Sequence, residues 1–357
     1  MTAVKVEKVR TGQSGALPWL VTLGAPLLGV AAGLLIGALL ILLAGAEPIE
    51  AYSAMMKGAF GGRRQIEETL LKTAPLLLMG LGLTAAFRAR VWNIGGEGQY
   101  YIGALAGGAI ALNFADQWPR ALLILVMLLA GALGGALWAA LAAFLKIRRG
   151  INEIISTLML NYIAILFMEY MARGPMQEPG GYLPESAQFA AAARMPALSG
   201  SRIHIGVLVA LLMIPVVYAL LWSTPLGFRL RAVGSRSSVA RYAGIKVERL
   251  ILFALMFSGG LAGLAGIIEV SSLHTRLKGG ISGDYGFSGI LVALLGRMHP
   301  VGVAVAALFF AALTIGAQSM HVLYQLPVTL AGAVQAVVVL CVLAADAIAH
   351  GKLHRGQ

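Results

Sequence analysis

The stretch FRARVWNIGGEGQYYIG, residues 87–103, decides the fold. It carries two arginines, a glutamate, an asparagine and a glutamine, and it stands between runs that are almost entirely apolar. A polar group is costly inside a membrane, and where it occurs there it usually serves function. The stretch therefore indicates a chain that crosses the membrane and is itself a candidate for part of the functional site.

Composition agrees with a membrane protein. Hydrophobic residues make up 59% of the 357 residues and charged residues 12%, with a mean hydropathy of +0.84. This length holds roughly ten spans of about 20 residues. The net charge of +12 comes from basic residues in the gaps between apolar runs, which the positive-inside rule explains better than nucleic-acid binding does. A single cysteine, Cys341, and scattered histidines predict neither a disulfide framework nor a metal site.

Apolar runs predict an all-α polytopic membrane protein of about ten transmembrane helices. The run near 286–297 is too short to cross upright, so we expect a short or broken helix there. Residues 17–46 are too long for the apolar part of a signal peptide and are expected to be a retained first span. The runs are 17–45, 69–87, 96–113, 121–145, 153–171, 205–222, 250–269, 286–297, 301–318 and 327–348.

Basic flanks predict the orientation, because Lys and Arg near span ends stay in the cytoplasm. Both termini are expected inside, with tails 1–16 and 349–357 around a single permease domain, 17–348. Residues 172–204 form an external loop, either an ordered cap or a surface loop, and 223–249 form a basic cytoplasmic loop. Within the latter, two short helices are expected, from 237 to 242 and from 246 onward, punctuated by Gly234 and Gly244.

Several chemistries are excluded by the sequence. It contains no phosphate-binding loop of the GxxxxGK[ST] kind, so the chain is not expected to hydrolyse ATP or to be an enzyme. Carboxylates within the runs are few and lie mostly at predicted span ends, which disfavours a proton-coupled carrier. These carboxylates are Glu97, Glu153, Glu169, Glu269 and Asp284.

Four separated stretches resemble the permease subunits of bacterial ABC importers of the simple-sugar and nucleoside branch. They are FRARVWNIGGEGQYYIGALAG (87–107), INEIISTLMLNYIA (151–164), LRAVGSRSSVARYAGIKVERL (230–250) and GDYGFSGILVALLGRMHPVG (283–302). The resemblance covers most of residues 20–345. It implies a multi-pass subunit of the bacterial inner membrane, working with a cytoplasmic ATPase, a second permease that is a diverged sibling, and an extracytoplasmic substrate-binding lipoprotein. It implies no cofactor on this chain; ATP and Mg are used by the partner ATPase.

By the same resemblance, 230–250 couples the permease to the ATPase. The positions that match the family pattern are Gly234, Ser235, Ala240, Arg241 and Gly244. Physically, glycine allows a partner backbone to approach closely, and Arg241 is able to form charge-assisted hydrogen bonds. The alternative is a basic loop kept inside by topology alone.

Polar residues of the spans are candidates to line the translocation path. Asn93, Glu97, Gln99 and Tyr101 lie at the expected inner mouth of the third span, and Asn152, Ser156 and Asn161 share part of one face of the fifth. Phe287 is a candidate to stack on a base or sugar ring. The alternatives are that Glu97 pairs with Arg88 or Arg90 and caps its helix, that the asparagines only join helices, and that the aromatics anchor span ends.

The predicted function is therefore the membrane-spanning permease subunit of an ATP-driven importer for a small neutral polar solute, and the resemblance favours a nucleoside. A simple sugar or a riboflavin-like solute are alternatives within the same type of importer. An ion-coupled secondary carrier and a membrane scaffold without transport are the competing classes. A similarity between GGEGQYYIGALAGG (95–108) and GGISGDYGFSGILVALLG (279–296) also suggests an internal repeat with broken helices.

Overall fold

The computed structural model describes residues 17–324 and 327–355. In these ranges helices predominate and no strand occurs beyond isolated bridges, so the predicted all-α class is confirmed. The helices are α1 (Leu17–Leu43), α2 (Pro48–Phe60), α3 (Arg63–Arg88), α4 (Gly96–Phe114), α5 (Arg120–Arg149), α6 (Glu153–Arg173), η1 (Ala191–Ala193), α7 (Ile205–Trp222), α8 (Pro225–Ser235), α9 (Ser237–Tyr242), α10 (Val247–Glu269), η2 (Val270–His274), α11 (Tyr285–Leu295), α12 (Pro300–Tyr324) and α13 (Val328–Arg355).

Every predicted apolar run coincides with a helix, including the short one, α11. Among the described residues, 7 helices are long and apolar enough to cross a membrane, or up to 8 if α1 and α2 form one broken span. The helices α4 and α11 are not among them. A polytopic membrane protein is thus supported, while ten crossings and the cytoplasmic position of both termini stay predictions. The helix α2 lies in a gap between the apolar runs and was not predicted.

The chain divides into two compact units, so the expected single domain over 17–348 stays a prediction. Unit 1 comprises Met1–Ala51 and Tyr324–Gln357 and contains α1 and α13. These two helices approach closely at glycines of α1: a Cβ on Gly29 or Gly33 would lie 2.5 Å from the Cα of Val342 or Val338. Small residues permit this backbone proximity in helices that cross lipid.

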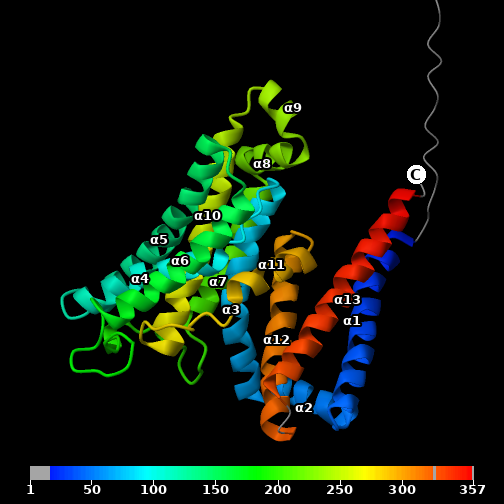
Figure 1. Cartoon of the computed structure of the whole chain (residues 1–357), viewed down its shortest axis with the longest axis horizontal. Coiled ribbons are helices and arrows are strands. Elements are labelled where there is room, and N and C mark those ends of the chain that lie inside the picture. Colours follow the sequence, from blue (N-terminus) through cyan, green and yellow to red (C-terminus); the bar gives the residue numbers. More distant parts are fainter. Residues whose placement is uncertain (1–16, 325–326, 356–357) are drawn as a thin grey trace, which may run out of the picture. The chain divides into compact units, whose positions relative to one another are not determined.

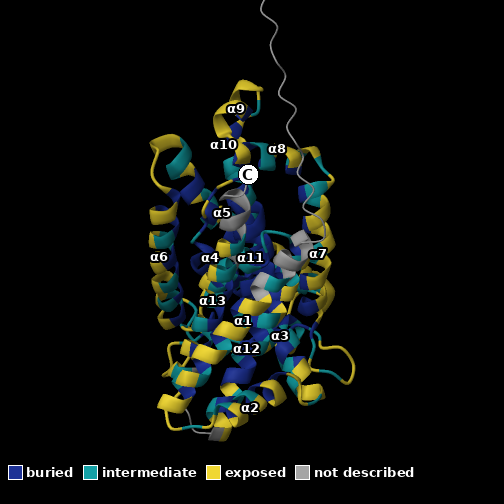
Figure 2. Cartoon of the chain, turned by 90° about the vertical axis from the view of Figure 1, so that its right-hand side faces the viewer, coloured by how far each residue is buried: buried dark blue, intermediate teal, exposed yellow. Residues whose placement is uncertain are grey.

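Unit 2, Tyr52–Leu323, is built around α3, α4, α5 and α10 (Figure 1). The apolar window of α3 is 89% buried, whereas those of α5, α6 and α7 are 28% buried. Figure 2 shows the same division, with buried residues concentrated on the central helices and exposed ones on α6 and α7. A helix that is apolar all round and buried lies in the core of a bundle, and the less buried helices present their remaining apolar faces to lipid.

Glycines join α5 and α10 in unit 2. A Cβ on Gly263 would collide with the carbonyl of Gly131, and one on Gly135 with the carbonyl of Gly259. These glycines form a packing surface between the two helices. Gly260 is different, because its nearest neighbour would be at 3.5 Å, an ordinary contact.

The two polar loops are ordered. In 172–204, Phe189 is fully buried and its N–H donates to the carbonyl of Thr275, so this loop is the ordered cap of the two alternatives. In 223–249, the helix expected from 237 to 242 is present as α9, and Gly244 ends it at φ +80°. The expectation that Gly234 interrupts the loop is wrong: it lies inside α8, which begins at Pro225 after the Thr224 cap.

Candidate functional site

Asn93 holds the non-helical segment between α3 and α4 in place. Its side chain is fully buried. Its Nδ2 donates to Gln99 Oε1 at 2.8 Å and to Ser258 Oγ of α10 at 2.9 Å. Its Oδ1 accepts from Gln99 Nε2 at 2.9 Å and from the N–H of Gly95 at 3.0 Å. These four bonds use the whole hydrogen-bonding capacity of the amide and tie the segment to α10.

On its other side, backbone groups of the same segment form hydrogen bonds with side chains of α6. Asn161 accepts at Oδ1 from the N–H of Gly98 at 2.8 Å and donates from Nδ2 to the carbonyl of Ile94 at 2.8 Å. Thr157 Oγ1 accepts from the N–H of Ile94 at 3.2 Å. Non-helical backbone is tolerated at membrane depth only where such partners are supplied. The polar face of the fifth predicted span therefore does join helices, as one of its two interpretations required.

Two further candidates on α6 lie apart from this network. Ser156 is buried and donates to the carbonyl of Glu153 in its own helix at 3.3 Å. Asn152 is exposed and caps α6, accepting from the N–H of Ile154 at 2.8 Å. Their predicted place on the path stays a prediction.

Glu97 caps a helix, although not the one expected. Its Oε2 accepts from the N–H of Gly286 at 2.8 Å, so a carboxylate in the first turn of α4 meets the first turn of α11. Helix N-termini favour negative charge, and here two of them share one carboxylate. The alternative pairing with Arg88 is wrong: that arginine donates to the carbonyl of Met298 and lies 5.1 Å from the Trp222 ring.

The segment before α4 meets α10 near the middle of that helix. Ser258, which Asn93 contacts, is eleven residues beyond Val247, the first residue of α10. At 1.5 Å per residue this is about 17 Å along the helix. The chain runs without helix into the bundle before α4 begins, and the expected position at the inner mouth of the third span stays a prediction.

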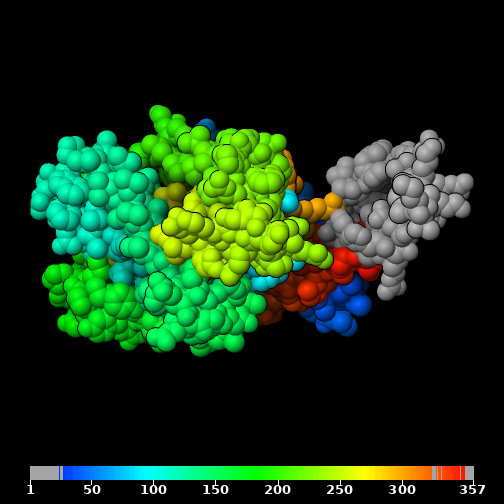
Figure 3. Space-filling view, turned by 90° about the horizontal axis from the view of Figure 1, so that it is seen from above, coloured from blue at the N-terminus to red at the C-terminus, as the bar shows by residue number. Residues whose placement is uncertain are grey.

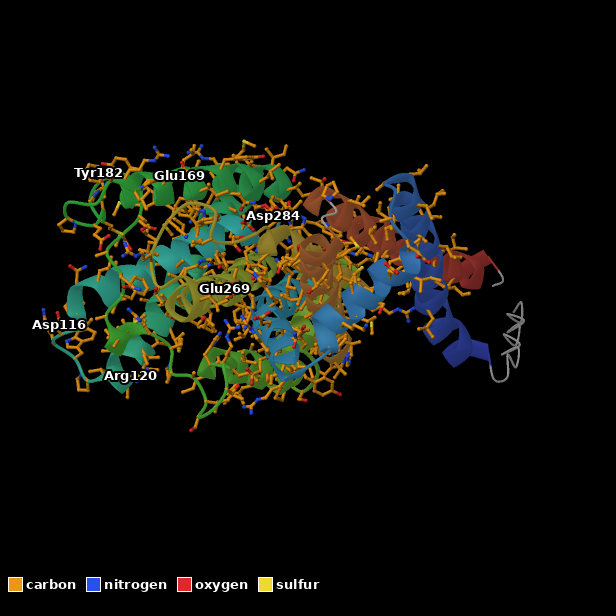
Figure 4. The ribbon with its side chains drawn as sticks, turned by 90° about the horizontal axis from the view of Figure 1, so that it is seen from below. Asp116, Arg120, Glu169, Tyr182, Glu269 and Asp284 are labelled. Atoms are coloured by element: carbon orange, nitrogen blue, oxygen red, sulfur yellow. The ribbon has the colours of Figure 1, made fainter. Side chains whose placement is uncertain are left out.

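A second polar cluster was missed as a site, although Glu269 had been noted as a carboxylate within a run. Tyr285 donates to Glu269 Oε1 at 2.9 Å, and Lys72 Nζ lies 2.5 Å from the Tyr285 hydroxyl and 3.9 Å from Glu269 Oε1. The side chain of Glu269 is 2% exposed and that of Lys72 30%. Figure 4 shows Glu269 among the central helices. Only contact between α3, α10 and α11 brings these residues together, and no sequence pattern indicates it.

The aromatic candidates differ in accessibility. Tyr101 is buried against Tyr100, with ring centroids 5.8 Å apart in an edge-on arrangement. Phe287 on α11 is 39% exposed. Of these two, only Phe287 presents a ring that a solute is able to reach without rearrangement.

Of the predicted coupling residues, some are buried within this chain and the others are exposed. Gly234 is buried, and a Cβ there would collide with the carbonyl of Arg88, so its closest approach is to α3 of its own chain. Ala240 is also buried. Arg241 is exposed and forms an ion pair with Glu248 at 2.5 Å. Ser235 and Gly244 are exposed as well.

Two titratable groups outside the spans have shifted pKa values. Hydrogen bonding to Glu178, together with the charge of Glu185, raises the pKa of Arg276, and both contacts tie the cap to the segment after η2. Burial lowers the pKa of His204 to about 4, and neither of its ring nitrogens has a hydrogen-bond partner among the described residues.

A family model described as branched-chain amino acid transport system / permease component matches residues 65–343. The chain belongs to this family. It is therefore an ABC transporter permease, a multi-pass protein of the inner membrane and not an enzyme. The resemblance read from the four stretches is confirmed.

Curated relatives cover nearly the whole chain. A glucose ABC transporter permease of Haloferax volcanii is 35% identical, covering 90% of this chain and 87% of the relative. The guanosine ABC transporter permease NupP of Bacillus subtilis is 35% identical, covering 92% and 96%. The nucleoside ABC transporter permease NupB of Lactococcus lactis is 32% identical, covering 83% and 84%. A second, more distant permease from each of these organisms also matches. No solved structure matches the chain.

Proposed function

We propose that this permease carries nucleosides inward. The observation that carries the proposal is the similarity to the guanosine permease NupP, which extends over 96% of that relative. The glucose-named relative is equally identical, and this favours a simple sugar as the second candidate. A riboflavin import permease at 24% identity is more distant.

The polar groups in the middle of the bundle support a neutral solute. The carboxylates of Glu97 and Glu269 are already bonded there, to the backbone of α11 and to Tyr285, so neither is held free for a cation. A site that binds an anion or a cation would need an opposite charge held free for it. The exposed ring of Phe287 offers a surface on which a base or a sugar ring stacks.

The energy comes from a partner ATPase that binds ATP and Mg, because this chain has no phosphate loop of its own. The loop 223–249 is the point of coupling, with Arg241 and Gly244 accessible to the ATPase and Gly234 and Ala240 seating the loop on the spans. Closure of the ATPases on ATP would tilt the spans through α8 and α9. An extracytoplasmic lipoprotein would deliver the solute.

The partner permease is a diverged sibling of this chain. Each of the three organisms named above has two permeases that match it, and within each pair one is more similar than the other. Such pairs are expected where two different permeases form one importer. A homodimer would need only one.

The test is uptake of labelled guanosine, adenosine and glucose by cells that carry the whole transport system. Nucleoside uptake should be abolished by Arg241→Glu and retained in the matched control Arg236→Glu in the same loop. If the cells take up glucose and neither nucleoside, the substrate is a simple sugar and not a nucleoside. Uptake that survives the loss of ATP but stops when the proton gradient collapses would identify a secondary carrier.

Physical coupling is tested separately by co-purification. Gly244 is exposed at φ +80°, with no atom within 4 Å of a Cβ placed there. A tryptophan there has open space but strains the backbone at this positive φ, so the amount of the Gly244→Trp permease in the membrane is measured first. The protein that remains there should lose the ATPase. Retained ATPase would exclude 230–250 from the coupling role.

A further inference from the structure

An open groove of about 830 Å³ lies between α8 and the start of α10. One part of its lining is apolar and includes Leu226, Phe228 and Phe253. The other part is basic and consists of Arg229, Lys246 and Arg249. No carboxylate lines it. The groove thus combines a cluster of three positive charges with an aromatic and aliphatic wall.

The three cations are not neutralised by the protein. Within the described residues, none of Arg229, Lys246 and Arg249 forms an ion pair. The adjacent carboxylate, Glu248, is already paired with Arg241. Like charges gathered on one groove repel each other, and a bound anion removes this repulsion. An occupant of the groove is therefore expected to be negatively charged.

The groove lies where two membrane spans leave the bilayer. The span α7 ends at Trp222, three residues before α8, and α10 begins at Val247. Arg249 is in the first turn of α10, and Phe253 lies one turn further along the same face of the helix. Phe257 follows at the next turn and stacks on Phe253 at 5.7 Å. Positive charge therefore lies at headgroup depth, with aromatic rings one and two turns deeper.

We propose that this groove binds an anionic phospholipid, with the phosphate between Arg229, Lys246 and Arg249 and the acyl chains along Phe253. Basic pockets between spans on the cytoplasmic side have the chemistry that anionic headgroups require. A free phosphate would use the cations but would leave the apolar wall uncovered. The lipid would bridge α8 and α10 at the base of the coupling loop.

Gly244, a predicted coupling residue, also lines this groove, but the tip of the loop offers a protein partner the more exposed surface. The tip, α9, exposes Val239 by 55% and Tyr242 by 96%. Figure 1 shows α9 extending beyond α8, and Figure 3 looks down on this end, where the yellow-green surface of α8 and α9 lies over the spans. The tip is therefore the surface that a cytoplasmic partner reaches first, while the groove lies against the spans where lipid is available.

The experiment measures binding of phosphatidylglycerol to the full-length permease in its complete transporter, by native mass spectrometry, with phosphatidylcholine as the neutral comparison. A basic residue near a membrane surface contributes about fivefold to the affinity for anionic lipid. The double variant Lys246→Gln with Arg249→Gln should therefore bind phosphatidylglycerol about 30-fold more weakly. Arg229→Gln, on the other wall, should weaken binding about fivefold.

The matched control is Arg148→Gln with Arg149→Gln, two exposed basic residues at the end of α5. It should bind phosphatidylglycerol as the unaltered protein does. Equal binding by the double variant and this control would overturn the proposal. Displacement of the lipid by glycerol phosphate at equal concentration would show a site for a soluble anion instead. Loss of the ATPase from the double variant, with lipid binding unchanged, would show a protein contact.

Discussion

Replacement of Asn93 by alanine should destabilise the permease strongly. Asn93 is fully buried and forms four hydrogen bonds, at 2.8 to 3.0 Å, to Gln99, Ser258 and the backbone of Gly95. Such bonds average about 0.6 kcal/mol within membranes and about 1 kcal/mol in soluble proteins. Together they contribute about 2 to 4 kcal/mol. The alanine variant should lose this amount of folding free energy.

Thermal unfolding of the purified permease in detergent, followed by tryptophan fluorescence, measures the effect. For a chain of this length the loss corresponds to a fall in Tm of about 5 °C. The matched control is Asn152→Ala, the same substitution at an exposed asparagine that forms one capping bond. Loss of a cap costs about 1 kcal/mol, so its Tm should fall by about 2 °C.

The comparison between the two asparagines can refute the reasoning. If Asn93→Ala and Asn152→Ala unfold within about 1 °C of each other, the four bonds do not hold the segment before α4. If the Tm of Asn93→Ala is unchanged while guanosine uptake is lost, Asn93 acts on the solute and not on the fold. A large fall in Tm with uptake proportional to the folded fraction supports the structural role.

Three further predictions follow from single contacts. The pKa of His204 is about 4 in the folded protein and 6.5 in the unfolded chain, so the unfolded chain binds the extra proton. The free energy of unfolding should be highest above pH 6.5 and should fall by about 3 kcal/mol as the pH drops to 4. A His204→Leu variant that keeps the same pH dependence of unfolding would contradict this. Gly263→Ala should lower the unfolding free energy by about 1 to 3 kcal/mol, while Gly260→Ala on the same helix is tolerated; equal Tm values would exclude the close approach of α5 and α10. Lys72→Met should destabilise by leaving Glu269 buried without its cation, and adding Glu269→Gln should restore stability; additive losses in the double variant would rule out the pair.

Sequence periodicity was sufficient for the helices that coincide with apolar runs, because such runs have few structural solutions in a membrane. The sequence also identified the end of α9 at Gly244. Periodicity did not predict α8, since Pro225 after Thr224 is a helix start whose continuation carries two arginines and two glycines. Periodicity also did not give the number of membrane crossings. The run 96–113 forms the helix α4, but α4 is not apolar enough to be a candidate span by itself.

The candidate site was only partly predictable, for a different reason. Asn161 lies on a polar face of its helix, and the sequence left open whether that face meets solute or another helix. Its partners are backbone groups of residues 94 and 98, more than 60 positions away in the chain and outside any regular element until α4 begins. The contact between Glu97 and Gly286 spans 189 positions. Periodicity carries no information about such pairs.

The two glycine-rich stretches that the sequence singled out, 95–108 and 279–296, prove to be connected. Each begins a helix, α4 or α11, after non-helical backbone, and Gly286 N–H of one bonds to Glu97 of the other. A break in a helix within a membrane leaves backbone groups that need partners, and Asn93, Thr157 and Asn161 supply them. Asn93 has no donor or acceptor left over. A solute could therefore bond to Asn93 only if the segment before α4 moved, and the place of Asn93 on the translocation path stays a prediction.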